Sequence, residues 1–214
     1  MAKTQVMIVE DQNMPRQLFE MLVEASDRYE TAVSIDNAAV ADIYCMRGGI
    51  DLVLMDVVTK NGANGLDAAA KIKKHDPKIK VIIVTSMPEY SYLERAREAG
   101  VDSFWYKDIS RETILNIMDR TMAGESVYPD SIPKIQVGDA TGYDFSQREY
   151  EVLRELLKGA TNIEIGKKLY ISPDTVKKHI QHMLDITGFH SRTELAVRVR
   201  ETGLVIPEAE EQKK

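Results

Sequence analysis

The chain has 214 residues, of which 43% are hydrophobic and 29% charged, so we expect a packed core and exclude a disordered chain. The formal net charge of −6 argues against a protein coated in nucleic acid or bound to a membrane surface. One cysteine, Cys45, excludes a disulfide framework, and neither a signal peptide nor an apolar run of about 20 residues is present, so we expect a cytoplasmic protein that does not enter a membrane.

Residues 5–123 alternate between short apolar runs and helical patterns. The expected strands cover residues 6–9, 31–35, 52–55, 81–84 and 103–106. A helix is expected after each strand: the first has Pro15 in its opening turn, the second ends at Arg47, and the others cover residues 66–75, 90–99 and 111–123. Five successive strand–helix units predict an α/β domain with a doubly wound, flavodoxin-like, five-stranded parallel sheet.

Two details of these helices can be compared directly with a structure. The first helix is expected to bury the apolar residues that share one face, which are Leu18, Phe19, Leu22 and Val23. As N-caps, we expect Asp36 or Asn37 before the second helix and Ser110 before the last.

Four of the expected strands lead into hydrophilic residues, which are Glu10 and Asp11, Asp56, Thr85, and Lys107. The carboxyl ends of parallel strands meet in one crevice, so these side chains are expected to form one site. Close carboxylates repel one another and require a hard cation, and Mg²⁺ is suited to them. We therefore expect Mg²⁺ as the cofactor and Asp56 as the acceptor of a phosphoryl group.

Lys107 and Thr85 suit the same chemistry. A lysine supplies a compact positive charge for phosphoryl oxygens, and a threonine hydroxyl can donate a hydrogen bond to them. A solvated lysine at a strand end and an ordinary strand threonine are the alternative interpretations of these two residues.

The order of these residues resembles the receiver domain of two-component signalling, over residues 5–123. The resemblance implies that a sensor histidine kinase phosphorylates Asp56. It also implies a role for each of the other positions: Asp11, Asp56 and the Val58 carbonyl hold Mg²⁺, Glu10 assists through water, Thr85 and Lys107 bind the phosphoryl group, and Phe104 changes rotamer when Thr85 moves.

The chain departs from the receiver pattern at two places. Receivers often have Met-Pro in the loop after the phosphorylated acid, and residues 57–62 contain neither. The lysine is often followed by proline, and here Lys107 precedes Asp108. The first departure is expected to alter the lifetime of the phosphorylated state.

A composition change after residue 123 predicts a domain boundary. Residues 124–143 contain Pro129, Pro133 and several glycines without helical or strand periodicity, so we interpret them as a linker. The charge excess also changes, because residues 1–143 carry the net −6 and residues 144–214 are neutral. The expected domains are residues 1–123, a linker over 124–143, a second domain over 144–206 and a polar tail over 207–214.

Four helix-start signals follow the linker. Capping boxes begin at Ser146, Thr161 and Ser191, and Ser172-Pro173 is an N-cap followed by proline at the first helical position. They predict helices ending near residues 158, 169, 186 and 201, and thus a separate all-α domain. The second and third helices form a helix-turn-helix unit, in which Val176, Ile180, Met183 and Leu184 face inward and the third helix reads DNA.

The second domain resembles the LuxR-type DNA-binding domain of NarL/FixJ regulators, over residues 145–201. The residues that carry the resemblance are Ser146-x-Arg148-Glu149-x-Glu151-Val152-Leu153, Gly159-x-x-Asn162-x-Glu164-Ile165, Ser172-x-x-Thr175-Val176-Lys177-x-His179 and Arg192-Thr193-Glu194-Leu195. The resemblance implies that Thr175, Lys177, Lys178 and His179 lie near DNA and that Thr161, Asn162 and Lys168 contact phosphates. Asp185, Ile186 and Thr187 depart from the family pattern.

The expected function is a transcription factor, not an enzyme, that forms a homodimer on phosphorylation and binds double-stranded DNA, with RNA polymerase as a possible partner. One alternative is a phosphorylation-independent regulator whose vestigial receiver serves dimerisation. Another is a metal-dependent phosphate-ester hydrolase fused to an adaptor. A metal site at His179 and His182, completed by Asp185, is the less favoured interpretation of those histidines.

Overall fold

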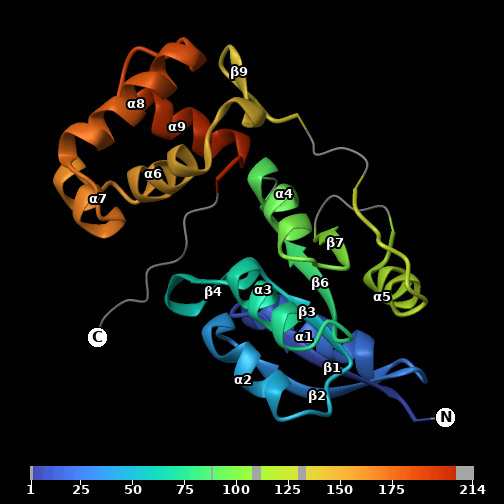
Figure 1. Ribbon diagram of the computed structural model, residues 1–214. Helices are drawn as coiled ribbons and strands as arrows, with labels where there is room; N and C mark the ends of the chain where they lie inside the picture. Colours follow the sequence, from blue (N-terminus) through green and yellow to red (C-terminus); the bar gives the residue numbers. More distant parts are fainter. Residues whose placement is uncertain (1, 88, 108–111, 130–133, 206–214) are drawn as a thin grey trace. The chain divides into compact units, whose positions relative to one another are not determined.

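The computed structural model describes residues 2–87, 89–107, 112–129 and 134–205 (Figure 1). These residues divide into two compact units. The first comprises residues up to 86 together with 92–129, and the second comprises 134–205 together with 87 and 89–91. None of the described helices is both long enough and apolar enough to cross a lipid bilayer.

The first unit contains the predicted five-stranded parallel sheet. Its strands are β1 (Thr4–Val9), β2 (Tyr29–Ile35), β3 (Leu52–Met55), β6 (Lys80–Thr85) and β7 (Ser103–Tyr106). They are arranged in the order β2-β1-β3-β6-β7, and every neighbouring pair is parallel. The order places β1 and β3 side by side in the middle of the sheet, with β7 at one edge. The predicted fold class of this domain is confirmed.

In the described part of the chain, five helices accompany the sheet: α1 (Asn13–Glu24), α2 (Ala41–Met46), α3 (Gly65–His75), α4 (Tyr90–Glu98) and α5 (Ile114–Met122). Helices α1 and α5 cover one face, where Phe19 and Ile117 pack in one core cluster with Ile8 and Leu54. The alternate residues of each strand, such as Met7 and Val53, point to the opposite face and are also fully buried. A sheet buried on both faces explains why its strands are continuous apolar runs.

Two predictions about the helices are wrong. Leu18 was expected on the buried face of α1, but 54% of it is exposed, whereas Phe19 and Val23 are buried. Helix α5 begins at Ile114, not at residue 111, because Thr113 is its N-cap and accepts a hydrogen bond from the Asn116 amide. The expected cap Ser110 lies outside the described residues.

The second helical segment is shorter than predicted. Its predicted cap Asn37 accepts a hydrogen bond from the Ala39 amide, but the turn that follows is a 3-10 helix, η1 (Ala38–Val40), and α2 begins only at Ala41. The segment ends at Met46, and Gly48 and Gly49 follow with positive φ.

The loop after β3 is an ordered hairpin. It consists of β4 (Val58–Thr59), the 3-10 turn η2 (Lys60–Gly62) and β5 (Ala63–Asn64). The Thr59 hydroxyl accepts a hydrogen bond from the Ala38 amide and donates one to the Ala63 carbonyl, so this buried side chain fixes the hairpin to η1. The sequence predicts a loop at residues 57–62 but not this hairpin.

Residues 124–143 contain more structure than the predicted linker. Residues 126–128 lie along β7, since the Phe104 amide donates a hydrogen bond to the Val127 carbonyl (2.8 Å). Further along, β8 (Gln136–Val137) and β9 (Ala140–Thr141) form a hairpin, followed by the 3-10 turn η3 (Gly142–Asp144). The prediction of no regular structure here is wrong because strands this short produce no visible periodicity.

The second unit is mainly helical, with α6 (Gln147–Leu157), α7 (Asn162–Leu169), α8 (Pro173–Thr187) and α9 (Arg192–Thr202). Its core joins residues of all four helices with Val137 and Ala140 of the hairpin. The capping boxes at Ser146 and Thr161 are both present. The third is incomplete: Ser191 accepts a hydrogen bond from the Glu194 amide, but the Glu194 carboxylate accepts from the His190 amide. The predicted four-helix domain is confirmed.

Candidate functional site

Three carboxylates meet at the carboxyl edge of the sheet. Asp56 follows β3, and Glu10 and Asp11 follow β1, its neighbour in the sheet. One carboxylate oxygen of each residue lies within 4.8 Å of the others. Among the described residues, this is the single group of three or more acidic, histidine or cysteine side chains with such spacing. The parallel pairing of β1 with β3 thus brings together acids that are 45 residues apart in the sequence.

Lys107 reaches the same place from the end of β7. Its Nζ atom lies 3.0 Å from Oδ2 of Asp56 and 2.5 Å from Oε2 of Glu10. The Lys107 amide donates a hydrogen bond to the Thr85 carbonyl (2.9 Å), which ties the ends of β6 and β7 together. The lysine is therefore buried against two acids and is not the solvated strand-end residue of the alternative interpretation.

The three acids carry more negative charge than the single Lys107 ammonium neutralises. Burial raises the pKa of Asp56 to about 7, the Lys107 ammonium opposes that rise, and the Glu10 carboxylate adds to it. Burial alone would lower the pKa of Lys107, but the charges of Asp56 and Glu10 raise it above its ordinary value. An additional cation would relieve the repulsion between the acids.

The donor set fits a hard divalent cation. Mg²⁺ prefers carboxylate oxygens and water at short distances, and three carboxylates with only one lysine offer that combination. Glu10 and Asp56 are almost fully buried, whereas Asp11 is partly exposed, which leaves a side open to water. Val58, the predicted carbonyl ligand, lies in β4 two residues after Asp56.

The two predicted switch residues, Thr85 and Phe104, are buried on the neighbouring strands β6 and β7. Thr85 is buried at the end of β6, in register with Tyr106 of β7. Phe104 is also buried, and its ring centroid lies 5.0 Å from that of Tyr106 and 6.3 Å from that of Tyr128. The Phe104 ring thus has one aromatic neighbour in β7 and one in the chain that follows α5.

Gly65 is a site residue that the sequence reading missed. An added Cβ atom there would lie 1.9 Å from the Asp56 carbonyl oxygen, so only glycine fits against the backbone of the acid. The Gly65 amide donates a hydrogen bond to the Val57 carbonyl (2.7 Å), which holds α3 close to the site. A glycine directly before the expected helix over residues 66–75 is the available signal.

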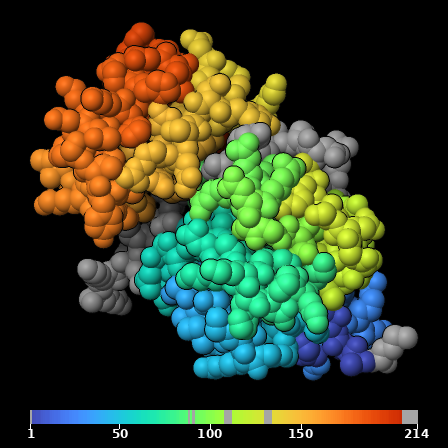
Figure 2. Space-filling model, viewed as in Figure 1, coloured from blue at the N-terminus to red at the C-terminus, as the bar shows by residue number. Residues whose placement is uncertain are grey.

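The helix-turn-helix unit presents the predicted polar surface. Val176, Ile180 and Met183 are buried, while Lys177 and Lys178 are exposed on the other side of α8. Thr175 and His179 are half-buried on the same helix. The surface of α7 and α8 is drawn in orange in Figure 2.

Three predicted phosphate contacts have protein partners. Lys168 Nζ lies 2.8 Å from a carboxylate oxygen of Glu155. The Thr161 hydroxyl donates to Glu164 within the capping box. Asn162 accepts a hydrogen bond from Arg192, so its side-chain amide is held in one orientation.

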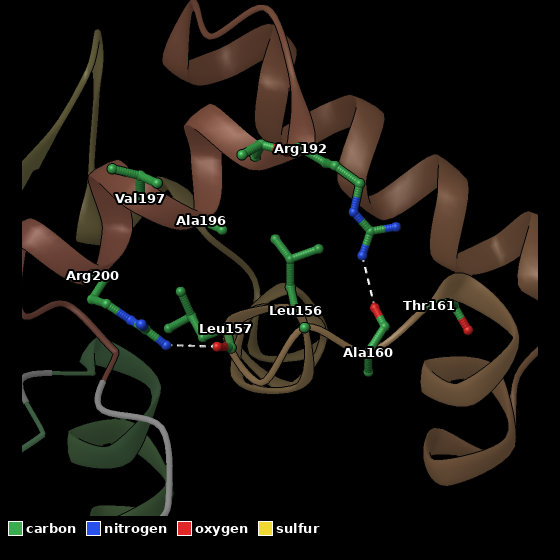
Figure 3. Close-up of a pocket in the computed structure, with 10 residues that line it drawn as sticks. Leu156, Leu157, Ala160, Thr161, Arg192, Ala196, Val197 and Arg200 are labelled. Atoms are coloured by element: carbon green, nitrogen blue, oxygen red, sulfur yellow. Dashed lines mark hydrogen bonds between the residues drawn. The ribbon is translucent and has the colours of Figure 1, made fainter.

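Arg192 belongs to a groove between α6 and α9, with a volume of about 360 Å³ (Figure 3). Its guanidinium also donates to the Ala160 carbonyl, and Arg200 donates to that of Leu157. The two arginines thereby bind the carbonyls at the C-terminal end of α6 and attach α9 to it. In the sequence, Arg192 is distinguished only as part of the LuxR-type pattern.

The two histidines of α8 do not share a carboxylate-completed metal cluster with Asp185 among the described residues. His182 Nδ1 lies 2.6 Å from a carboxylate oxygen of Glu149, and this contact links α8 to α6. Burial raises the pKa of Glu149, but hydrogen bonds from Ser146 and His182 lower it below its usual value.

Tyr170 is unusual among the residues of the turn. It has φ of 56° in the left-handed region, and 95% of its surface is exposed. Left-handed backbone is unfavourable for a bulky side chain, and the exposed ring gains nothing from packing.

Comparisons with known proteins agree with this arrangement. A family model of the response regulator receiver domain matches residues 6–119, and a model of the luxR family of bacterial regulatory proteins matches residues 144–199. The chain is 27% identical over 200 residues to a nitrate/nitrite response regulator protein homolog of Haemophilus influenzae, covering 91% of this chain and 95% of that protein. It is 34% identical over 160 residues to response regulator protein VraR of Staphylococcus aureus, covering 72% and 76%.

Solved structures show the same fold. The RcsB response regulator of Salmonella typhimurium is 19% identical, with a TM-score of 0.55 over 94% of this chain and 99% of that one. A LuxR-family DNA-binding response regulator from Staphylococcus aureus is 31% identical, with a TM-score of 0.51 over 56% and 98%.

An acid cluster on a receiver sheet, joined to a helix-turn-helix domain, defines a response regulator that acts on transcription. The chain belongs to the NarL/FixJ-type two-component response regulators, which join a receiver domain to a LuxR-type DNA-binding domain. The family predicted from the sequence is therefore confirmed.

Proposed function

We propose that the chain binds double-stranded DNA under the control of phosphoryl transfer to Asp56. An Asp56 carboxylate oxygen forms a new P–O bond, while the P–N bond within a phosphohistidine of a sensor kinase breaks. The histidine nitrogen keeps the electron pair of that bond and takes a proton from water. The single observation that carries this proposal is the convergence of Asp56, its neighbouring acids and Lys107 at one sheet edge.

The residues around Asp56 have complementary roles in this step. Lys107, already 3.0 Å from Asp56, neutralises the charge of the incoming phosphoryl oxygens. The hydroxyl of Thr85, the last residue of β6, donates a hydrogen bond to one of the phosphoryl oxygens. Asp11, Asp56 and the Val58 carbonyl would hold Mg²⁺, and Glu10 would assist through water. When bound, the ion supplies positive charge that offsets the developing charge of the transfer.

The output is proposed to be DNA binding through α8. Lys177 and Lys178 are exposed, and Thr175 and His179 lie on the same N-terminal half of that helix, which enters the major groove in helix-turn-helix proteins. Thr161, Asn162 and Lys168 would contact phosphates. The Lys168 contact would require exchange of its Glu155 partner for a phosphate oxygen.

A homodimer is the proposed DNA-binding species. Two copies on a two-fold operator double the base contacts and make binding steep in protein concentration. One similar solved structure is described as two RcsB dimers bound to two parallel DNAs, at 17% identity. The phosphoryl donor is proposed to be a sensor histidine kinase, and RNA polymerase the partner that reads the occupied operator.

The first experiment uses Trp105, the single tryptophan, which lies on β7 between Phe104 and Lys107. Its fluorescence is followed while Mg²⁺ and then beryllofluoride, a phosphoryl mimic, are added, and mass and DNA affinity are measured in the same samples. We expect a fluorescence change, dimer formation and tighter DNA binding for the wild type, and none of the beryllofluoride-dependent changes for Asp56→Asn.

The matched control is Asp51→Asn. Asp51 lies directly before the first residue of β3, whereas Asp56 lies directly after its last residue. It should respond as the wild type does. A wild-type chain that binds DNA equally well with and without beryllofluoride would reject the proposal in favour of a receiver that serves dimerisation alone.

A further inference from the structure

Residues 126–128, which follow α5, form what we call the strap, and they lie against the edge strand β7. The Phe104 amide donates to the Val127 carbonyl (2.8 Å), and the Val127 amide donates to Ser103 Oγ (3.0 Å). Ser126 Oγ donates to the Asp102 carbonyl (2.7 Å). The described part of the sheet ends at β7, so the strap occupies an edge that would otherwise leave Phe104 without its backbone partner.

Tyr128 fastens the end of the strap. Its hydroxyl donates to the Val101 carbonyl (2.9 Å), and the Arg97 guanidinium lies over its ring, 4.9 Å from the centroid. The other neighbour of the ring is Phe104, at 6.3 Å. Burial raises the pKa of Tyr128 to about 12, Arg97 opposes that rise and Asp102 adds to it, so the hydroxyl stays protonated and able to donate at neutral pH.

The same short strand carries the strap and the acid site. Strand β7 has only four residues, Ser103–Tyr106. Ser103 and Phe104 hold the strap, and Lys107, the next residue after the strand, holds Asp56 and Glu10. A phosphoryl group on Asp56 adds negative charge directly beside Lys107, so the position of the lysine and the end of β7 must adjust to it.

The strap is held by local contacts of three residues, partly at the surface. Ser126, Val127 and Tyr128 each make a hydrogen bond to residues 101–104, but Ser126 is exposed and the cation–π contact involves an exposed arginine. The conformational entropy lost when the strap is ordered costs a free energy similar in size to the stabilisation that these contacts provide. A small displacement of β7 or of the Phe104 ring is therefore sufficient to shift the strap between bound and released states.

We propose that residues 126–128 are a releasable strap on the β7 edge, and that phosphoryl transfer to Asp56 releases it. The inference rests on the proposed function, because it takes Asp56 as the phosphoryl acceptor. While the strap is bound, the chain between its last residue and β8 covers residues 129–135. When the strap is released, the connection to β8 begins after Gly124, which ends α5, and covers residues 125–135.

Release therefore lengthens the connection to the DNA-binding domain. At about 3.4 Å per extended residue, the maximum span increases from roughly 24 Å to roughly 37 Å. The longer connection allows two DNA-binding domains of a dimer to reach half-sites that are about 34 Å apart on DNA. The strap thus determines how far the output domain can extend from the receiver.

Hydrogen exchange, measured by mass spectrometry on the full chain, tests the strap directly. In the wild type with Mg²⁺, beryllofluoride should accelerate exchange in peptides covering residues 103–105 and 125–129 by about tenfold or more. Arg97→Ala should accelerate exchange of the same peptides without beryllofluoride. The Arg97 side chain is exposed, so the Arg97→Ala variant is expected to fold.

The matched control is Arg47→Ala. Arg47 lies over the Tyr44 ring, 5.4 Å from its centroid, and this contact resembles that of Arg97 with Tyr128 but lies in α2 and its C-cap. Arg47→Ala should behave as the wild type does in residues 125–129. Equal exchange in the two arginine variants would overturn the strap.

Trp105 fluorescence separates this inference from the proposed function. If beryllofluoride changes the fluorescence and the DNA affinity but leaves exchange of residues 125–129 unchanged, the strap is rejected and the phosphoryl switch stands. If fluorescence, DNA affinity and exchange all remain unchanged in the wild type, both proposals are rejected.

Discussion

The backbone of Gly65 is packed against the carbonyl group of Asp56 so closely that a Cβ atom on Gly65 would lie 1.9 Å from the carbonyl oxygen. We expect Gly65→Ala to destabilise the receiver by about 2–3 kcal/mol, because either α3 or the Asp56 backbone must move. Thermal unfolding followed by Trp105 fluorescence measures the effect. The Mg²⁺ affinity of the variant should fall as well, since the displaced backbone carries the Asp56 carboxylate.

Gly62→Ala is the matched control in the same loop. Gly62 has φ of +72° and nothing within 4 Å of its added Cβ atom, so the expected loss is about 1 kcal/mol, from backbone conformation alone. If the two variants lose equal stability, the close approach to Asp56 has no energetic consequence.

Mg²⁺ should stabilise the receiver through the three acids. At a concentration ten times its dissociation constant, the expected gain is about 1.4 kcal/mol, because the ion binds only the folded site. Asp11→Asn should lose most of that gain. Asp67→Asn, an exposed acid on α3, should retain it. Unfolding curves with and without the ion measure both, and an equal gain in Asp11→Asn would contradict the assigned ligands.

Asp102 should stabilise the receiver in a pH-dependent manner. Burial raises its pKa, but hydrogen bonds from Lys73, Lys80 and the Val81 amide lower it below the ordinary value. A lowered carboxyl pKa stabilises the fold above the ordinary value of 3.8 and loses that contribution as pH falls through the folded-state pKa. We expect Asp102→Asn to cost about 1–2 kcal/mol at pH 7.

Urea unfolding of the wild type and of Asp102→Asn between pH 7 and pH 3 checks the sign. The difference between the two proteins should shrink below about pH 4, as the wild-type carboxylate becomes protonated. A difference that stays constant over this range would show that the aspartate acts through packing and not through its charge.

Tyr170→Gly should stabilise the DNA-binding domain. The left-handed backbone of Tyr170 favours glycine, and the ring, which is 95% exposed, contributes no burial. The expected gain is about 0.5–1 kcal/mol, seen by calorimetry as a higher melting temperature of one of the two domains. Tyr170→Phe keeps the strain and should melt as the wild type does. A lower melting temperature for Tyr170→Gly would mean that the ring makes a contact that stabilises the turn.

The sheet could be predicted from the sequence because its strands are buried on both faces and hence read as continuous apolar runs. The convergence of the carboxyl ends of parallel strands predicted that Asp56, Glu10 and Lys107 lie together. In the structure both carboxylates lie within hydrogen-bond distance of Lys107. The capping boxes at Ser146 and Thr161 placed two helix starts correctly, because a cap is a local signal.

Features that depend on tertiary contacts were not predictable in this way. The exposure of Leu18 depends on which side of α1 meets the sheet, and its helical periodicity alone does not decide between neighbouring positions. The strap and the β8–β9 hairpin are too short for periodicity, and the partner of the strap lies 24 residues earlier in the chain. The need for glycine at residue 65 follows from a backbone that approaches it in space.

The β8–β9 hairpin determines where the polypeptide can be divided for separate study of its halves. Val137 and Ala140 of the hairpin are buried in the helical core, as are Leu204 and Val205 beyond α9. A fragment cut to residues 144–199, the range that the luxR family model matches, would lack all four of these side chains. A DNA-binding fragment that retains residues 134–205 keeps this core complete, and a receiver fragment should extend through Pro129 to retain the strap.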